Sequence, residues 1–171
     1  EERQHVLFEI ERVLFTKRYN LSQKHLDIFS VQSISIIYSI WEGFIQEAFK
    51  LLGDQINNRN LEFTRLSDNI VIHHMENTFK QLNEYPQKPK NKIEYFNKLK
   101  GIYSIENQTI SRVINTESNV SFEVLNNLLK TFSLEPFPEF WDNYKHPKPS
   151  LKTTMATFLR FRNSVSHGGD I

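Results

Sequence analysis

Residues 34–49 of this 171-residue chain read ISIIYSIWEGFIQEAF, and this stretch decides the fold. Apolar side chains recur through it at helical spacing and occupy most sides of the helix that they define. Ser22 provides a helix cap upstream, and the apolar pattern continues downstream, so we predict one long helix over Ser22–Asn57. Because its middle is apolar on most sides, we expect this helix to be the central buried element of an all-α fold.

Shorter helices are predicted around it, because the same periodicity recurs along the chain. In chain order they are Val6 to about Arg18, Arg59–Leu82 (most clearly from Leu66), Ile93–Tyr103 (where a strand is the alternative), Phe122–Phe132, and Leu151 to about Ser166. Proline-bearing connections occupy residues 85–90 and 136–149, and residues 109–115 give no clear prediction. The length fits one domain, which we place at residues 1–171.

The composition is that of a soluble globular protein, with 39% hydrophobic and 24% charged residues. The absence of cysteine excludes disulfides and thiolate metal sites, and it suits a cytoplasmic protein. The longest apolar run, Ile34–Ile45, is interrupted by polar residues, so we expect no membrane span. We find no signal peptide, and because Glu1 is not preceded by a methionine we expect the natural start to lie upstream. A net charge of +1 means that any nucleic-acid site must be local.

The candidate functional residues lie near the end, where residues 159–169 read LRFRNSVSHGG. Arginine stabilises phosphate charge and histidine transfers protons near neutral pH, which is what RNA cleavage without a metal requires. On an ideal helix this region has two stripes. The apolar stripe, expected to face the core, contains Leu151, Met155, Phe158, Phe161 and Val165, and the small, polar and cationic stripe contains Ala156, Arg160, Asn163 and His167.

Arg162 lies at the edge of the apolar stripe, and two interpretations remain open. It is either a phosphate-binding residue or a partly buried arginine held by a carboxylate. Glu42 is the candidate carboxylate, because a charged group on an apolar helix is costly unless it is paired. We therefore predict a Glu42–Arg162 pair, with a further role for Glu42 in tuning Arg162 or His167 as the alternative. Gly43, beside Glu42, allows another helix to approach closely.

Three short segments resemble one known family. Residues 162–167 carry Arg162-Asn163-x-x-x-His167, residues 38–45 read YSIWEGFI, and residues 115–120 read NTESNV just before a helix. In this order they are similar to motifs of the HEPN superfamily, in particular its MAE-like and RiboL-PSP-like prokaryotic branches.

The resemblance implies a HEPN-like helical bundle with a long helical hairpin and additional short helices. It implies a homodimer that cleaves RNA without a metal or other cofactor, as a toxin or anti-phage effector with an antitoxin or defence-system partner protein. By this carry-over His167 transfers the proton, Arg162 stabilises phosphate charge and Asn163 positions the scissile group, with Arg160 and Glu42 in support. Gly169 stands where some toxin members have a modifiable tyrosine. The alternative function is a non-catalytic HEPN dimerisation or sensing module.

Two other patterns carry weaker expectations. His73-His74 with Glu76 suggests a metal site, but adjacent histidines on a helix point about 100° apart, so we expect none. Aromatic and basic residues alternate between Tyr95 and Tyr103, as they would on an RNA-stacking surface, although a solvated amphipathic segment is the favoured interpretation.

Overall fold

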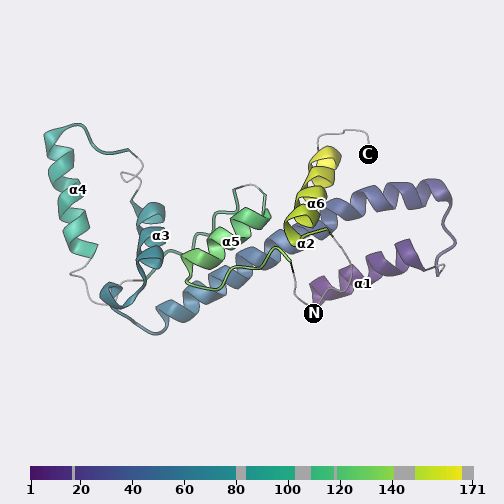
Figure 1. Cartoon of the computed structure of the whole chain (residues 1–171), viewed down its shortest axis with the longest axis horizontal. Coiled ribbons are helices and arrows are strands. Elements are labelled where there is room, and N and C mark those ends of the chain that lie inside the picture. Colours follow the sequence, from purple (N-terminus) through teal and green to yellow (C-terminus); the bar gives the residue numbers. More distant parts are fainter. Residues whose placement is uncertain (17, 80–83, 103–108, 118, 141–148, 167–171) are drawn as a thin grey trace. The chain divides into compact units, whose positions relative to one another are not determined.

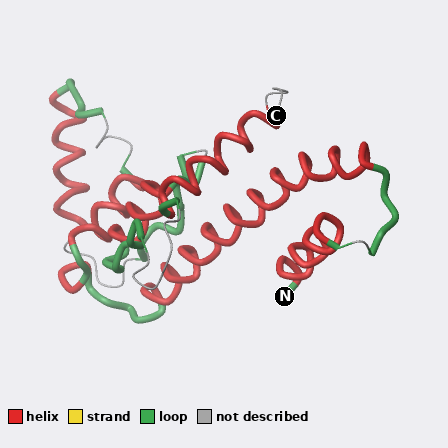
Figure 2. Tube along the Cα trace, turned by 45° about the vertical axis from the view of Figure 1, so that its right-hand side comes forward, coloured by secondary structure: helices red, strands yellow, loops and turns green. Residues whose placement is uncertain are grey.

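The computed structural model describes residues 1–16, 18–79, 84–102, 109–117, 119–140 and 149–166. This described part contains six α-helices, one short 3-10 helix and no strand (Figures 1 and 2). They are α1 (Glu2–Phe15), α2 (Gln23–Asn57), η1 (Phe63–Arg65), α3 (Asp68–Thr78), α4 (Pro89–Ile102), α5 (Phe122–Thr131) and α6 (Leu151–Ser166). The all-α prediction is confirmed. The chain divides into two compact units, and its interpretation as one domain stays a prediction.

The first unit comprises Glu1–Ile45, Glu117–Glu123 and Pro138–Ile171, and it contains the helical hairpin. Helix α1 runs back along the first part of α2, so that Arg3 at its start lies beside Gly43. A Cβ added at Gly43 would lie 3.4 Å from the guanidinium of Arg3. That is an ordinary van der Waals distance to a flexible side chain, so the expectation that Gly43 allows a close helix approach stays a prediction. At the other end of the hairpin, Tyr19 donates a hydrogen bond to Glu9 (3.3 Å).

Helix α2 is buried along one side only. Tyr38, Ile45 and Phe49 are buried, whereas Ile36 is exposed and Phe44 retains 54% of its accessible surface. The prediction of burial on most sides is thus wrong for this part of the chain, because the described helices cover a single face. By length and composition α2 is long and apolar enough to cross a membrane, which we did not expect from its interrupted apolar run. The core helix of a soluble protein meets the same criteria.

The second unit comprises Gln46–Thr116 and Val124–Phe137. The helix predicted over residues 59–82 is interrupted here, because the chain is extended at Leu66 and Ser67 between η1 and α3. Phe132 at the end of α5 is the centre of the core. Its ring packs against Phe49 (centroids 5.3 Å apart) and His73 (5.4 Å).

Asparagine side chains anchor two extended segments of this unit. Asn57 both donates to the carbonyl of Ile110 (3.2 Å) and accepts from its N–H (2.7 Å). Asn126 makes the same pair of bonds with Phe137, at 3.2 and 2.8 Å. Each side-chain amide thus bonds both the N–H and the carbonyl of one residue. In a β-sheet a neighbouring strand would make these two bonds. Residues 109–115, which have no clear prediction from the sequence, form neither a helix nor a strand, and the Asn57 bonds hold this segment at Ile110.

Helices α4 and α6 complete the described elements. The segment beginning at Ile93 is a helix rather than a strand, and α4 starts before it, at Pro89, where proline is favoured. Helix α6 begins after Ser150, whose hydroxyl accepts from the N–H of Thr153 (3.1 Å). Phe161, expected in the core, is 37% exposed, because Arg162 rather than Phe161 occupies the inward side of that turn.

Candidate functional site

The three sequence motifs meet in the first unit. Tyr38 comes from α2, Asn119 and Val120 come from the segment before α5, and Arg162 comes from α6. The N–H of Val120 donates to the hydroxyl of Tyr38 (3.0 Å), and the guanidinium of Arg162 lies 4.4 Å from the centre of the Tyr38 ring. Residues that are 43 and 82 positions apart in the chain are thereby brought into one contact network. We call these four residues the motif junction.

Tyr38 is the centre of the motif junction and is 2% exposed. Burial raises its pKa, and Glu42 adds to this by its charge and by a side-chain hydrogen bond. The Val120 N–H and the charge of Arg162 act in the opposite direction. The net effect keeps the phenol protonated. It therefore accepts a bond from Val120 and presents a neutral aromatic face to the guanidinium.

Arg162 is half-buried and is held by neutral groups. Its Nη1 donates to the side-chain oxygens of Asn119 (3.2 Å) and Asn163 (3.0 Å), and its plane contacts the Tyr38 ring. Both hydrogen bonds leave from the same nitrogen. Since a guanidinium has five N–H donors, its Nη2 and Nε hydrogens take no part in these two bonds. Those hydrogens are the ones that bind an anion in a bidentate manner.

The structure brings two of the predicted site residues together, because Arg162 and Asn163 are hydrogen-bonded to each other. Arg160 is exposed, with its guanidinium 5.2 Å from the centre of the Phe161 ring. Glu42 is half-buried and acts on Tyr38 as described. The bonds described for Arg162 go to amide oxygens, so the Glu42–Arg162 pair stays a prediction. His167 lies outside the described residues, and its role also stays a prediction.

The comparison with known families agrees with this convergence. The sequence model of the RiboL-PSP-HEPN family matches residues 8–171. The chain belongs to the RiboL-PSP-HEPN family. No curated protein and no solved structure matches it. Membership of this HEPN family makes the chain a nuclease-like or RNA-related module, and the all-α fold is the one that HEPN domains have.

Tyr38 and Asn119 are residues of the motif junction that were not predicted from the sequence. Both belong to segments that resemble family motifs, and no role was predicted for either residue. The signal was their polarity: a tyrosine within a largely apolar helix and an asparagine just before a helix require hydrogen-bond partners once they are buried. The identity of those partners depends on contacts between distant segments, which periodicity does not reveal.

The His73-His74 pair of α3 is a core feature. Burial lowers the pKa of both histidines, and in the case of His73 the Ser111 backbone and the charge of Glu76 offset part of this effect. Asn77 donates to the Nδ1 of His73 (3.2 Å), which suits a neutral imidazole. Among the described residues, no three histidine, aspartate or glutamate side chains lie close enough together to hold a metal ion.

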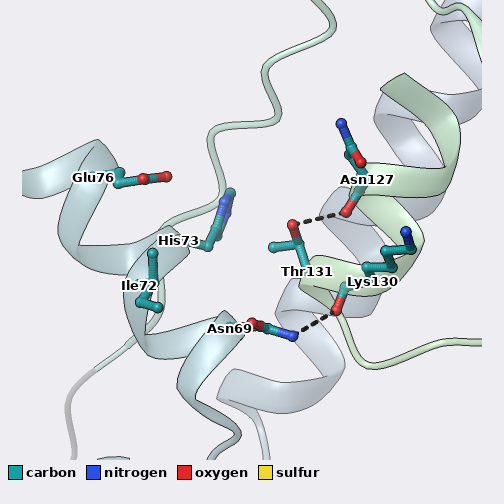
Figure 3. Close-up of a pocket in the computed structure, with 7 residues that line it drawn as sticks. All are labelled: Asn69, Ile72, His73, Glu76, Asn127, Lys130 and Thr131. Atoms are coloured by element: carbon teal, nitrogen blue, oxygen red, sulfur yellow. Dashed lines mark hydrogen bonds between the residues drawn. The ribbon is translucent and has the colours of Figure 1, made fainter. Parts of the chain in front are cut away.

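A groove of about 350 Å³ lies between α3 and α5 in the second unit (Figure 3). It is lined by Asn69, Ile72, His73, Glu76, Asn127, Lys130 and Thr131. Its described hydrogen bonds serve the helices: Asn69 donates to the carbonyl of Lys130 (3.2 Å), and Thr131 donates to the carbonyl of Asn127 (2.9 Å). None of the lining residues belongs to the three motifs, so we do not place the functional site in this groove.

Proposed function

We propose that the chain is a metal-independent endoribonuclease that acts as a homodimer, in a toxin–antitoxin or anti-phage defence system. The observation that carries this proposal is the state of Arg162. It is fixed in position by an aromatic ring and two amide oxygens, and all three are neutral. A positioned guanidinium whose Nη2 and Nε hydrogens take no part in these two bonds is suited to stabilising charge on a phosphate.

The proposed reaction uses the 2′-hydroxyl of RNA as the nucleophile. A histidine takes the proton from this hydroxyl as it attacks the adjacent phosphorus, and the bond to the 5′-oxygen breaks as that oxygen receives a proton from a second acid. The products carry a 2′,3′-cyclic phosphate and a 5′-hydroxyl. We assign the proton transfers to His167, and the second histidine comes from the partner copy. Arg162 stabilises the negative charge of the transition state. Asn163 positions the scissile phosphate.

The homodimer is supported by exposed apolar side chains of the first unit. Five large apolar side chains of α1 and the first part of α2 remain exposed: Phe8, Phe15, Ile28, Ile36 and Phe44. Packing against a second copy would remove such apolar surface from water. Two-fold symmetry lets one such surface pair with itself and bring two α6 helices to one cleft. Light scattering of the purified protein at micromolar concentration tests this, and a monomer only would overturn it.

The ribonuclease is tested by incubating single-stranded RNA with the purified protein in EDTA. Cleavage is expected in the wild type, with products ending in a cyclic phosphate. It should fall by about 100-fold or more in His167→Ala, as expected for loss of a general acid or base. The exposed arginine of η1 offers a matched control, and Arg65→Ala should cleave as the wild type does. Undiminished cleavage by His167→Ala would eliminate the mechanism.

A non-catalytic HEPN dimerisation or sensing module is the second candidate. It is favoured by the same contacts of Arg162, because a half-buried arginine stacked on tyrosine also fastens α6 to α2. This candidate predicts that the dimer forms, that RNA stays intact in EDTA, and that Arg162→Ala changes only the melting temperature.

A further inference from the structure

We infer that α4 and the turn before it form a docking surface for single-stranded RNA. This inference rests on the proposed ribonuclease function and assigns its substrate a second set of binding residues, none of which belongs to the motif junction. It is carried by the charge of this segment and by two half-exposed aromatic rings (Figure 1 shows α4).

The segment is the basic part of a nearly neutral chain. Residues 88–100 contain five of the 21 lysines and arginines but one of the 20 acidic residues. They therefore carry a net +4, which leaves −3 for the rest of a chain whose total is +1. Concentrated positive charge of this kind is the electrostatic footprint of a nucleic-acid site, because each lysine that contacts a phosphate releases a counterion.

The aromatic side chains of this segment have distinct roles. Tyr95 is buried, and the rings of Tyr85 and Phe96 pack edge-on against it, at 5.6 and 6.1 Å between centroids. Tyr85 and Phe96 themselves are 50% and 53% exposed. The buried ring of Tyr95 thus packs against two rings that are each about half exposed to solvent. Rings held in this way are the platforms on which unpaired bases stack.

The lysines lie beside these rings. Lys92, Phe96 and Lys100 follow one another at intervals of four residues, so they share one side of α4. The Lys92 ammonium lies 5.3 Å from the centre of the Tyr85 ring, and Lys98 and Glu94 form an exposed pair at 3.4 Å. Phe96 therefore has a lysine one turn away in each direction, and Tyr85 has Lys92 beside it, so that lysines flank the place where a base would stack.

The distribution of apolar groups favours RNA over a lipid surface. A helix that lies on a membrane exposes a continuous apolar face and places its lysines opposite. In α4 the side that carries Tyr95 and Leu99 is the less exposed one, whereas the exposed Ile93 and Phe96 lie among lysines and do not form a continuous apolar face. Interleaved rings and cations match the alternation of bases and phosphates in a single strand.

The test measures binding of a fluorescein-labelled single-stranded oligoribonucleotide by anisotropy, in the His167→Ala protein so that the probe is not cut. Phe96→Ala should weaken binding about tenfold without changing the salt dependence, since stacking is not ionic. The double variant Lys92→Gln and Lys100→Gln should lower the slope of log K against log salt by about 1.4, or 0.7 for each lost phosphate contact. Matched controls are Phe140→Ala, an exposed phenylalanine of the first unit, and Lys24→Gln; both should bind as the parent does.

Equal affinity of the α4 variants and the parent would overturn the inference. So would loss of binding to phosphatidylserine vesicles in Phe96→Ala while RNA binding is unchanged, because that result assigns the surface to a membrane. Cleavage by proteins that retain His167 separates this inference from the proposed function. If α4 variants cleave with the parental KM, the ribonuclease stands and the docking surface fails. If nothing is cleaved but binding still depends on Phe96, the docking surface stands and the ribonuclease fails.

Discussion

The motif junction of the first unit and the histidine pair of α3 in the second both place ionisable side chains against aromatic rings, but in opposite conditions. The groups around Arg162 are a ring face and amide oxygens, which interact favourably with a cation. His73 packs against Phe132, and His74 against Phe63, and burial lowers the pKa of both histidines. The aromatic contact thus stabilises a cation in one region, whereas burial favours the neutral form of both histidines in the other.

The two regions differ in whether their buried polar atoms have hydrogen-bond partners. Buried polar atoms at the junction have partners, as the Tyr38 hydroxyl and the Val120 N–H show. In α3, the Nε2 of His73 and the Nδ1 of His74 are buried without a well-formed hydrogen bond. Burial of this kind favours the neutral form of both imidazoles, so we expect acid to destabilise the folded protein. We expect substitutions at the junction to affect RNA cleavage, and changes at α3 to affect folding.

The largest expected effect is on catalysis, at Arg162. Arg162→Ala should lower the rate of RNA cleavage by about 100-fold or more, as does loss of one donor to a developing charge elsewhere. Arg162→Lys should recover little of this rate, because an ammonium neither stacks on Tyr38 nor binds phosphate in a bidentate manner. Single-turnover cleavage assays on folded protein measure both. Full recovery by lysine would show that only the charge is needed.

A smaller effect is expected on stability, at Tyr38. Tyr38→Phe keeps the ring beneath Arg162 but removes the acceptor of the buried Val120 N–H. An unsatisfied buried donor costs about 2 kcal/mol of unfolding free energy, measurable by urea denaturation. Cleavage by the folded protein should change far less than in Arg162→Ala. A cleavage loss as large as that of Arg162→Ala would mean that the hydroxyl, rather than the ring, sustains the junction.

The sequence predicted the helices better than it predicted their partners. Periodicity located α2, α5 and α6 within a few residues, because each helix shows its own apolar spacing. The break at Leu66 and Ser67 was missed, since a short extended link leaves the surrounding pattern nearly unchanged. Likewise the exposure of Phe44 and Phe161 follows from which face other helices cover. That information lies in contacts between distant segments.

The candidate site was predicted in part for the same reason. Arg162 and Asn163 were chosen from a local motif, and they are in contact. A carboxylate was expected as the partner of Arg162, because charge balance is the simplest rule that a sequence offers. The described hydrogen bonds instead use Asn119, which lies 43 residues away and whose neutral amide no charge rule selects.

Acid should destabilise the protein through α3. The folded-state pKa of His73 and His74 is lowered from the ordinary value of 6.5. At pH values below about 6.5 the unfolded chain therefore binds more protons than the folded chain does. The contribution of this pair to stability is therefore fully present above about pH 6.5, and it is lost as the pH falls from there toward the folded-state pKa values of the two histidines. Urea midpoints measured between about pH 7 and about pH 5 should decrease, and His73→Leu should reduce that decrease.

The exposed histidine of α2 supplies the control for this experiment. His25→Gln should leave the acid-induced loss of stability in place, since its side chain is at the surface. An unchanged loss in His73→Leu would mean that other groups, rather than the buried pair, bind the protons.

The smallest effect is expected at the exposed ion pair between Lys152 of α6 and Glu123 of α5, whose charged atoms lie 2.8 Å apart. The hydrogen bond with Lys152 lowers the pKa of Glu123, yet both side chains are more than half exposed. Solvent and salt screen such a pair, and holding two long side chains in one geometry costs entropy. Lys152→Ala should therefore leave the urea midpoint unchanged at low and at high salt. A decrease as large as that of Tyr38→Phe, present only at low salt, would mean that surface charge fastens α6 in place of the contact between Arg162 and Tyr38.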